Sequence, residues 1–136
     1  MKADLLLVHL YPDLLMTYGD RGNVLTLTRR ASWRGFSVEV VEVSRGEPIP
    51  EDADLVMIGG GSDRVQHLIG ADLAARGDPL RALAARGAVI LGICGGYQLL
   101  GHRYTATDGA DVGGQLTTGD VVSFLRWCRR TRPRRG

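Results

Sequence analysis

The sequence predicts one α/β domain with a parallel β-sheet and helices on both faces. Short apolar runs, as expected for strands buried on both sides, alternate with stretches whose apolar residues have helical spacing. Short connections between them favour right-handed crossovers, which place helices on both faces of such a sheet. With 136 residues and 44% hydrophobic composition, the chain is long enough for one domain with a sizeable core.

Four apolar runs predict the strands, and they lie at residues 5–8, 38–43, 55–58 and 88–91. The first predicted helix, residues 24–34, follows a polar loop in which Asp20 or Asn23 can cap it. Gly35 stands at the usual position after its C-terminus. The inward face of this helix is expected to comprise Val24, Leu27, Thr28 and Ala31.

Two more helices are predicted between the third and fourth strands. The first has apolar residues at amphipathic spacing, namely Val65, Leu68, Ile69 and Leu73. The Gly77-Asp78-Pro79 stretch breaks the pattern. The second helix is expected to end at Gly87 and to face inward through Leu80, Leu83 and Ala84.

Charge is distributed unevenly along the chain. All fifteen acidic residues occur at or before Asp120, whereas six arginines lie between Arg126 and Arg135. Without those six, eleven basic residues remain against fifteen acidic ones, so the body carries about −4 and shows no sign of binding nucleic acid. We expect a domain over residues 1–109 and a divergent, arginine-rich, disordered tail over residues 110–136.

Cysteine usage and hydropathy indicate a cytoplasmic protein. The two cysteines, Cys94 and Cys128, do not form a disulfide framework, which favours a reducing compartment. No stretch has the features of a signal peptide or the ~20 apolar residues of a transmembrane helix. We expect neither a metal site nor membrane insertion.

The most informative stretch is Gly92-Ile93-Cys94-Gly95-Gly96, which follows the last predicted strand. It has the Gly-x-Cys-x-Gly layout of a nucleophile elbow. The strand brings the cysteine to the edge of the sheet, and the glycines permit a sharp turn. The helix that follows directs its N-terminus at the sulfur, where its dipole favours a thiolate.

A second glycine turn, Gly59-Gly60-Gly61, follows the third predicted strand. Reactive groups in open α/β sheets gather beyond the carboxyl ends of the strands. If the third and fourth strands are neighbours, the two turns face each other across Cys94, and their N–H groups can form an oxyanion hole. The alternative is a pair of tight turns around a small buried cysteine. A nucleotide site fits poorly, because neither phosphate-binding glycine motif is present.

Three motifs occur in order along the chain, and they are Tyr18-Gly19-Asp20-Arg21-Gly22-Asn23, Ile58-Gly59-Gly60-Gly61-Ser62-Asp63-Arg64 and Gly95-Gly96-Tyr97-Gln98-Leu99-Leu100-Gly101. Together they resemble class I glutamine amidotransferases of the cobyric-acid-synthase-like branch, most closely the glutamine-hydrolysing subunits of lipid II isoglutaminyl synthase. The resemblance extends from Leu5 to about Gly109. It implies a Rossmann- or flavodoxin-like domain, incomplete on its C-terminal side.

The resemblance implies that Cys94 is the nucleophile that attacks the carboxamide of L-glutamine. Gly60 or Gly61, together with Gly95, match the oxyanion donors. Gln98 matches a residue that holds the substrate, although a helix-capping or surface role is an equal alternative.

Arg64 matches a possible contact to the substrate carboxylate, with an exposed surface arginine as the alternative. We interpret the first motif, which includes Tyr18, Asp20, Arg21 and Asn23, as loop structure or partner contact rather than chemistry. The resemblance implies no cofactor in this chain. It implies a heterodimer with a MurT-like Mur ligase that uses ATP to amidate the D-glutamate of lipid II in peptidoglycan synthesis.

One part of the family pattern is absent. The family requires a later histidine as general base, and none of His9, His67 and His102 matches it. We hypothesise a truncated or frame-shifted amidotransferase; a functional basic tail that binds an acidic partner or nucleic acid is the rival explanation. The alternatives for function are a catalytically inactive pseudo-amidotransferase that only binds its ligase, and a different thiol hydrolase with the same elbow.

Overall fold

The computed structural model describes residues 2–16, 20–101, 103–105, 109 and 111–113. Four strands form one sheet in the order β2-β1-β3-β4, and every neighbouring pair is parallel. Their bounds are Leu5–Leu10 for β1, Val38–Val43 for β2, Leu55–Ile58 for β3 and Val89–Gly92 for β4. The predicted parallel α/β sheet is therefore confirmed.

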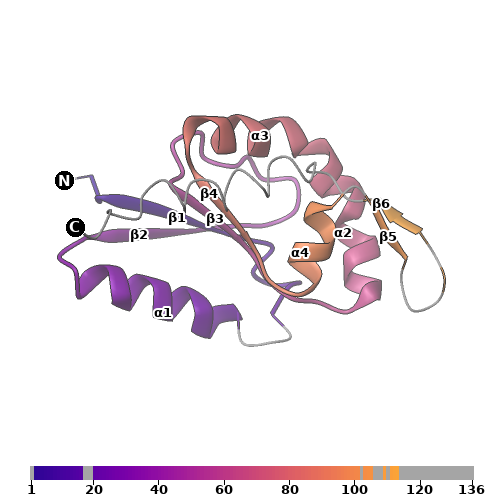
Figure 1. Cartoon of the computed structure of the whole chain (residues 1–136), viewed down its shortest axis with the longest axis horizontal. Helices are drawn as coiled ribbons and strands as arrows, with labels where there is room; N and C mark the ends of the chain where they lie inside the picture. The colour runs from indigo at the N-terminus through magenta and orange to yellow at the C-terminus, as the bar shows by residue number, and fades with distance from the viewer. Residues whose placement is uncertain (1, 17–19, 102, 106–108, 110, 114–136) are drawn as a thin grey trace, which may run out of the picture.

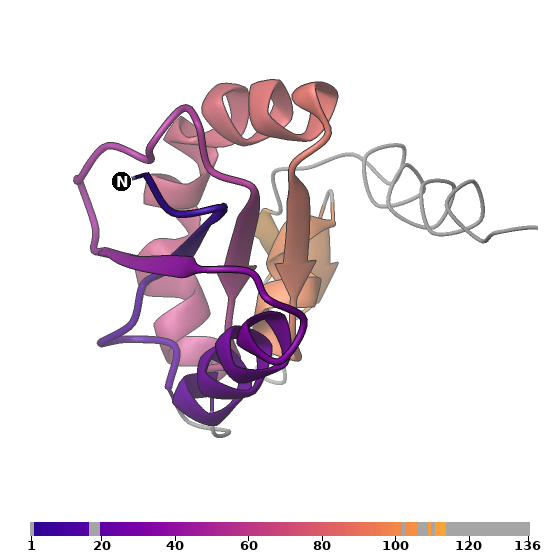
Figure 2. The same ribbon diagram turned by 90° about the vertical axis from the view of Figure 1, so that its left-hand side faces the viewer.

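Helices cover both faces of this sheet. Helix α1, Asp20–Ser32, connects β1 to β2, whereas α2, Asp63–Ala75, and α3, Gly77–Arg86, connect β3 to β4. The two connections run in opposite directions across the sheet, so crossovers of the same hand place their helices on opposite faces. Figures 1 and 2 show α1 and α3 on opposite sides of the strands.

The buried core lies mainly between the sheet and helices α2 and α3. Fully buried residues come from β1, β3 and both helices, and they include Val8, Leu10, Val56, Ile58, Ile69, Leu73, Leu80 and Leu83. The edge strand β4 is only half-buried along its length. No helix in the described part of the chain is long and apolar enough to span a membrane.

Helix α1 begins at Asp20, four residues before the predicted start. The Asp20 side chain is completely buried, so this residue belongs to the interior instead of a surface loop. The predicted inward face of α1 is only half-buried. Gly87 ends α3 with φ of 101°, as its position after the helix predicted.

Three of the four residues that we expected to face inward on α2 do so: Ile69 and Leu73 are buried, and Val65 packs against the core. Leu68, which we expected to face inward, is 49% exposed, and Gln66 is buried instead. The apolar spacing alone did not define the inward face, because the polar Gln66 occupies part of it. The reason is given by the hydrogen bonds of Gln66, which are described below.

A short antiparallel hairpin follows the parallel sheet. Its strands, β5 at Arg103–Thr105 and β6 at Asp111–Gly113, contact α4 and α2 respectively. Strand β6 lies within residues 110–136, which we expected to be a disordered tail, and the extent of that tail stays a prediction. Residues 114–136 lie outside the described part of the chain.

A hydrogen-bonded group joins the end of β1 to α2. The Tyr11 hydroxyl donates to Asp72 Oδ2 at 2.7 Å, and the Arg76 guanidinium lies 5.3 Å from the centroid of the Tyr11 ring. Burial and the Asp72 carboxylate together raise the pKa of Tyr11 far above its ordinary value. Tyr11 therefore remains a hydrogen-bond donor and anchors α2 beside the carboxyl end of the sheet.

Candidate active site

Cys94 occupies the turn between β4 and α4, Gly95–Leu100, and its side chain is exposed. Its backbone has φ of 52° and ψ of −114°. Among the described residues other than glycine, only Tyr11 and Cys94 have a positive φ. Such strain persists where surrounding contacts enforce it, and a strained strand-to-helix turn is the geometry of a nucleophile elbow.

Close backbone contacts enforce this turn. A Cβ atom on Gly96 would lie 2.2 Å from the Ile58 carbonyl oxygen, so any other residue at this position would force α4 and β3 apart. The Gly96 N–H donates to the Gly59 carbonyl at 3.0 Å, and the Ile93 N–H donates to the Ile58 carbonyl at 2.9 Å. Backbone hydrogen bonds thus join the elbow directly to the end of β3.

The two glycine turns face each other, as expected if β3 and β4 are neighbours. The Gly60 N–H already donates to Asp20 Oδ2 at 2.9 Å, which conflicts with its use as an oxyanion donor. The Gly61 and Gly95 N–H groups make no hydrogen bond within the described part of the chain. Of the three predicted glycines, Gly61 and Gly95 therefore keep a donor for a ligand.

Asp20 holds the glycine turn from the start of α1. Its side chain is fully buried, and its other oxygen accepts a 3.4 Å hydrogen bond from Asn23 Nδ2. A Cβ on Gly59 would lie 2.4 Å from the Asp20 carboxyl carbon, so the carboxylate packs directly on the turn. Our interpretation of Asp20 as a cap or a partner contact missed this role. No local pattern could have revealed it, because the two groups are 40 residues apart.

Gln66 is a second residue that the sequence analysis did not identify. It is 1% exposed, and its Nε2 donates to the Gly61 carbonyl and to Gln98 Oε1, both at 3.1 Å. A Cβ on Gly95 would lie 2.7 Å from the same nitrogen. Gln66 thus touches the glycine turn, the elbow and Gln98. A polar residue at an inward helical position was the available signal.

The remaining predicted substrate residues differ in their placement. The exposed residue Gln98 lies on α4, within hydrogen-bond distance of Gln66. Arg64 is exposed at the second position of α2, where it lines a surface hollow with His67 and Leu68. No contact in the described structure joins Arg64 to Cys94, so its predicted role stays a prediction.

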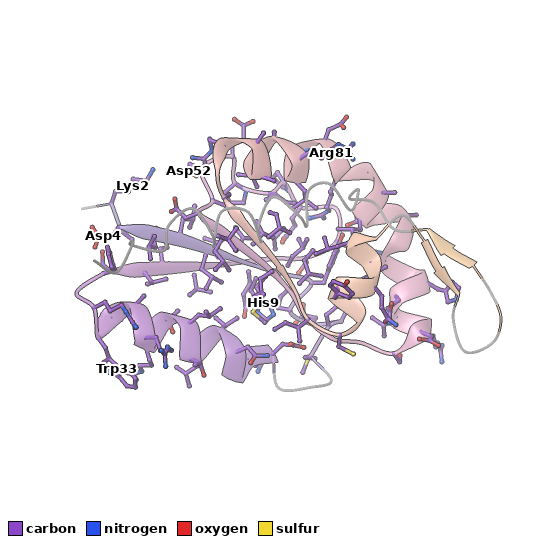
Figure 3. The ribbon with its side chains drawn as sticks, viewed as in Figure 1. Lys2, Asp4, His9, Trp33, Asp52 and Arg81 are labelled. Carbon is purple, nitrogen blue, oxygen red and sulfur yellow. The ribbon has the colours of Figure 1, made fainter. Side chains whose placement is uncertain are left out.

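The described histidines do not pair with Cys94. His9 on β1 is 1% exposed and is aligned with Met57 of β3, so a whole strand separates it from β4, at about 10 Å. Figure 3 shows His9 in the interior of the molecule. Burial lowers its pKa, opposed by the nearby Glu42 and Asp20 carboxylates. His67 is exposed on α2, and His102 lies outside the described residues.

Comparison with known families gives one match along most of the chain. The model of the CobB/CobQ-like glutamine amidotransferase domain matches residues 7–128. This span continues beyond residue 109, where we expect the domain to end, and that boundary stays a prediction.

The curated relatives match this chain over only part of their own length. The chain is 40% identical over 132 residues to the glutamine-hydrolysing subunit GatD of lipid II isoglutaminyl synthase from Staphylococcus aureus, covering 88% of this chain and 54% of that protein. The same subunit from Streptococcus pneumoniae is 39% identical over 109 residues, with 79% and 42% covered. A cobyric acid synthase from Methylobacterium nodulans is 39% identical over 88 residues, with 65% and 18% covered. The chain spans about half the length of the GatD relatives.

Proposed function

Because the chain belongs to the CobB/CobQ-like glutamine amidotransferase family, we propose that it releases ammonia from L-glutamine for use by a ligase. The observation that carries this proposal is the geometry at Cys94. The exposed Cys94 thiol lies on a strained turn. A hydrogen bond between Gly96 and Gly59 joins this turn to the neighbouring glycine turn. This arrangement suits acyl transfer, in which a nucleophile and backbone donors converge on one carbonyl group.

In the proposed reaction, the Cys94 sulfur attacks the carboxamide carbon of glutamine. The carbonyl oxygen becomes an oxyanion, which accepts hydrogen bonds from the Gly61 and Gly95 N–H groups. A general base takes the proton of the thiol, and as the carbon–nitrogen bond breaks it gives that proton to the departing ammonia. Water cleaves the resulting glutamyl thioester, which releases glutamate and restores the thiol. Neither His9 nor His67 is placed to move these protons.

The partner and acceptor in this proposal follow from the names of the relatives. Two of them are GatD subunits of lipid II isoglutaminyl synthase. We therefore propose a heterodimer with a MurT-like Mur ligase, which would use ATP to amidate the D-glutamate of lipid II with the ammonia released here. This chain itself would need no cofactor. We also propose a cytoplasmic location.

The test is ammonia release from glutamine by the full chain, co-purified with a MurT-like ligase. Replacing Cys94 with alanine should reduce release to background, because the proposed thioester forms on the Cys94 sulfur. Cys128→Ala is the matched thiol control and should leave the rate unchanged. Ammonia release that survives Cys94→Ala would exclude this function.

Two further outcomes separate the alternatives. Stable binding to the ligase without glutamine turnover by either form would indicate a pseudo-amidotransferase. Thiol-dependent hydrolysis of other amides or esters, without ligase binding, would indicate a different hydrolase that uses the same elbow.

A further inference from the structure

We propose that Gln66 is a positioning residue that fixes the Gln98 carboxamide with its NH₂ group available to the ligand of Cys94. Gln66 is 1% exposed on α2, and its single amide nitrogen bridges the glycine turn and α4. The inference rests on the proposed function, since the ligand is taken to be glutamine. It adds a residue that acts through Gln98 without touching the reacting atoms.

The orientation of both amides follows from one group whose polarity is fixed. The Gly61 carbonyl can only accept a hydrogen bond, so Gln66 must turn its Nε2 toward it. The same nitrogen then faces Gln98, which must present its Oε1 as the acceptor. The remaining group of Gln98 is its NH₂. A backbone carbonyl thus determines, through Gln66, which end of Gln98 is free.

Burial makes this orientation rigid. Gln66 Oε1 is buried and has no hydrogen-bond partner within the described residues. Turning the amide over would bring this oxygen against the Gly61 carbonyl and lose both hydrogen bonds of Nε2. The Gly95 backbone also fills the adjacent space, because a Cβ there would lie 3.0 Å from the Gln66 amide carbon. Gln66 therefore has one stable arrangement.

Gln98 lies one helical turn after Cys94, and its backbone N–H donates to the Cys94 carbonyl at 3.1 Å. Residues one turn apart share a helix face, so a fixed NH₂ group on Gln98 would favour an anionic or carbonyl group on the ligand of Cys94. An NH₂ donor held in place binds a carboxylate more strongly than a freely rotating amide, because the ordering entropy has already been lost. If Gln98 were reversed, its oxygen would repel a carboxylate. Gln66 therefore selects the ligand end that Gln98 binds.

The experiment measures how fast Cys94 reacts with two reagents in the full chain carrying Cys128→Ala. One reagent is 6-diazo-5-oxo-L-norleucine, which has the carboxylate and amine of glutamine, and the other is iodoacetamide, which has neither. Gln66→Met, which removes the restraint, should slow the glutamine analogue about threefold. Gln66→Glu, which reverses Gln98, should slow it about tenfold, as expected for one hydrogen bond to a charged group. With iodoacetamide, the rate for each Gln66 variant should lie within twofold of the rate for the chain that keeps Gln66.

A double-mutant comparison separates positioning from a general structural effect. In a Gln98→Leu background, Gln66→Met should cause no further loss toward the analogue. His67→Gln, on the exposed side of α2, is the matched control and should leave both rates unchanged. Equal slowing of both reagents, or a full additional loss in the Gln98→Leu background, would overturn the inference.

The outcome also distinguishes this inference from the proposed function. If Cys94 of the unsubstituted chain does not react with the analogue, the proposed function fails, whatever the role of Gln66. The positioning is then judged from the ¹⁵N resonances of the Gln98 NH₂ group. They should shift with Gln66→Met and stay in place with His67→Gln, and unchanged resonances in both variants would contradict the positioning.

Discussion

Two buried polar side chains support the Cys94 turn at the residue scale. Asp20 accepts a hydrogen bond from the Gly60 N–H, and Gln66 donates a hydrogen bond to the Gly61 carbonyl. Burying a carboxylate is costly unless it is hydrogen-bonded, and a bond between a carboxylate and a backbone N–H is among the stronger kinds. The glycine turn is therefore held by side chains from α1 and α2, because glycine has no side chain with which to hold itself.

The first prediction concerns Asp20. Replacing it with alanine should lower the free energy of unfolding by about 1–3 kcal/mol, because the buried Gly60 N–H would lose its acceptor. Asp20→Asn keeps an acceptor oxygen and should cost less. Urea unfolding would measure both. The exposed neighbour Arg21→Ala is the control, expected within about 0.5 kcal/mol of the parent, and an Asp20→Ala variant as stable as this control would refute the prediction.

The second prediction concerns His9 and pH. Burial lowers its pKa below the ordinary 6.5, against the opposing effect of the Glu42, Asp20 and Asp13 carboxylates; the nearby Arg21 lowers it further. The unfolded chain then binds more protons than the folded chain below pH 6.5. Stability should be constant above that pH and should fall as the pH decreases, by at most about 1.4 kcal/mol per pH unit.

His9→Gln should remove this dependence in urea unfolding between pH 5 and pH 6.5. His67→Gln, at an exposed position, should retain it. The carboxylate of Asp72 does not interfere in this range, because its pKa is below 3.8: burial raises it, but hydrogen bonds from Tyr11 and Gly46 and the Arg76 charge outweigh that effect. An unchanged pH profile in His9→Gln would show that another group is responsible.

At the scale of elements, the decisive unit is the β4–α4 junction. Helix α4 has six residues, which is too short to be stable by itself. The helix is stabilised by the hydrogen bond from the Gly96 N–H to the Gly59 carbonyl and by the burial of Leu99 and Leu100. The strain at Cys94 is thus balanced by contacts of the helix that follows it. On the other side of the site, Tyr11 and Asp72 join β1 to α2.

The third prediction tests this junction. Gly96→Ala should destabilise the fold by about 3 kcal/mol, because its Cβ would lie 2.2 Å from the Ile58 carbonyl oxygen and β3 would have to move away from α4. Gly70→Ala in α2 is the matched control. It has open space around the new methyl group and should stabilise the helix by about 0.5–1 kcal/mol. Thermal unfolding would compare them, and equal transition temperatures would contradict the close contact.

At the scale of the whole molecule, apolar side chains remain exposed in the α1–β2 region. Trp33 is 78% exposed, Leu25 57% and Phe36 48%. Figure 3 shows Trp33 directed away from the end of α1. Exposed apolar surface of this kind favours association.

The fourth prediction is that the isolated chain self-associates at high concentration through this region. Sedimentation velocity should show a concentration-dependent increase in mean mass, reduced by Trp33→Lys and Leu25→Lys. Arg29→Lys, on the exposed side of α1, is the control and should not change it. A monodisperse monomer across the concentration range would contradict the prediction.

Local sequence patterns predicted much of the backbone. The bounds of β2 and β3 agree with the apolar runs, and α3 ends at Gly87 as predicted. The interruption between α2 and α3 falls at Arg76, however, and the Gly77-Asp78-Pro79 stretch forms the first turn of α3. The elbow at Cys94 was also predictable, because a Gly-x-Cys-x-Gly segment after a strand has few alternative conformations. These features depend on residues that are close together in the chain, so the local sequence is enough to predict them.

The tertiary structure alone decided how the site is held together. Asp20 and Gly60 are 40 residues apart, and Gln66 and Gln98 are 32 apart, so no local spacing relates them. Which glycine keeps a free N–H depends on a carboxylate from another helix, and the direction of the Gln98 amide depends on the Gly61 carbonyl. The sequence by itself determined the sheet, the nucleophile turn and the family. Only folding determined the partners of each polar group, because hydrogen bonds form between groups that are close in space, whatever their separation along the chain.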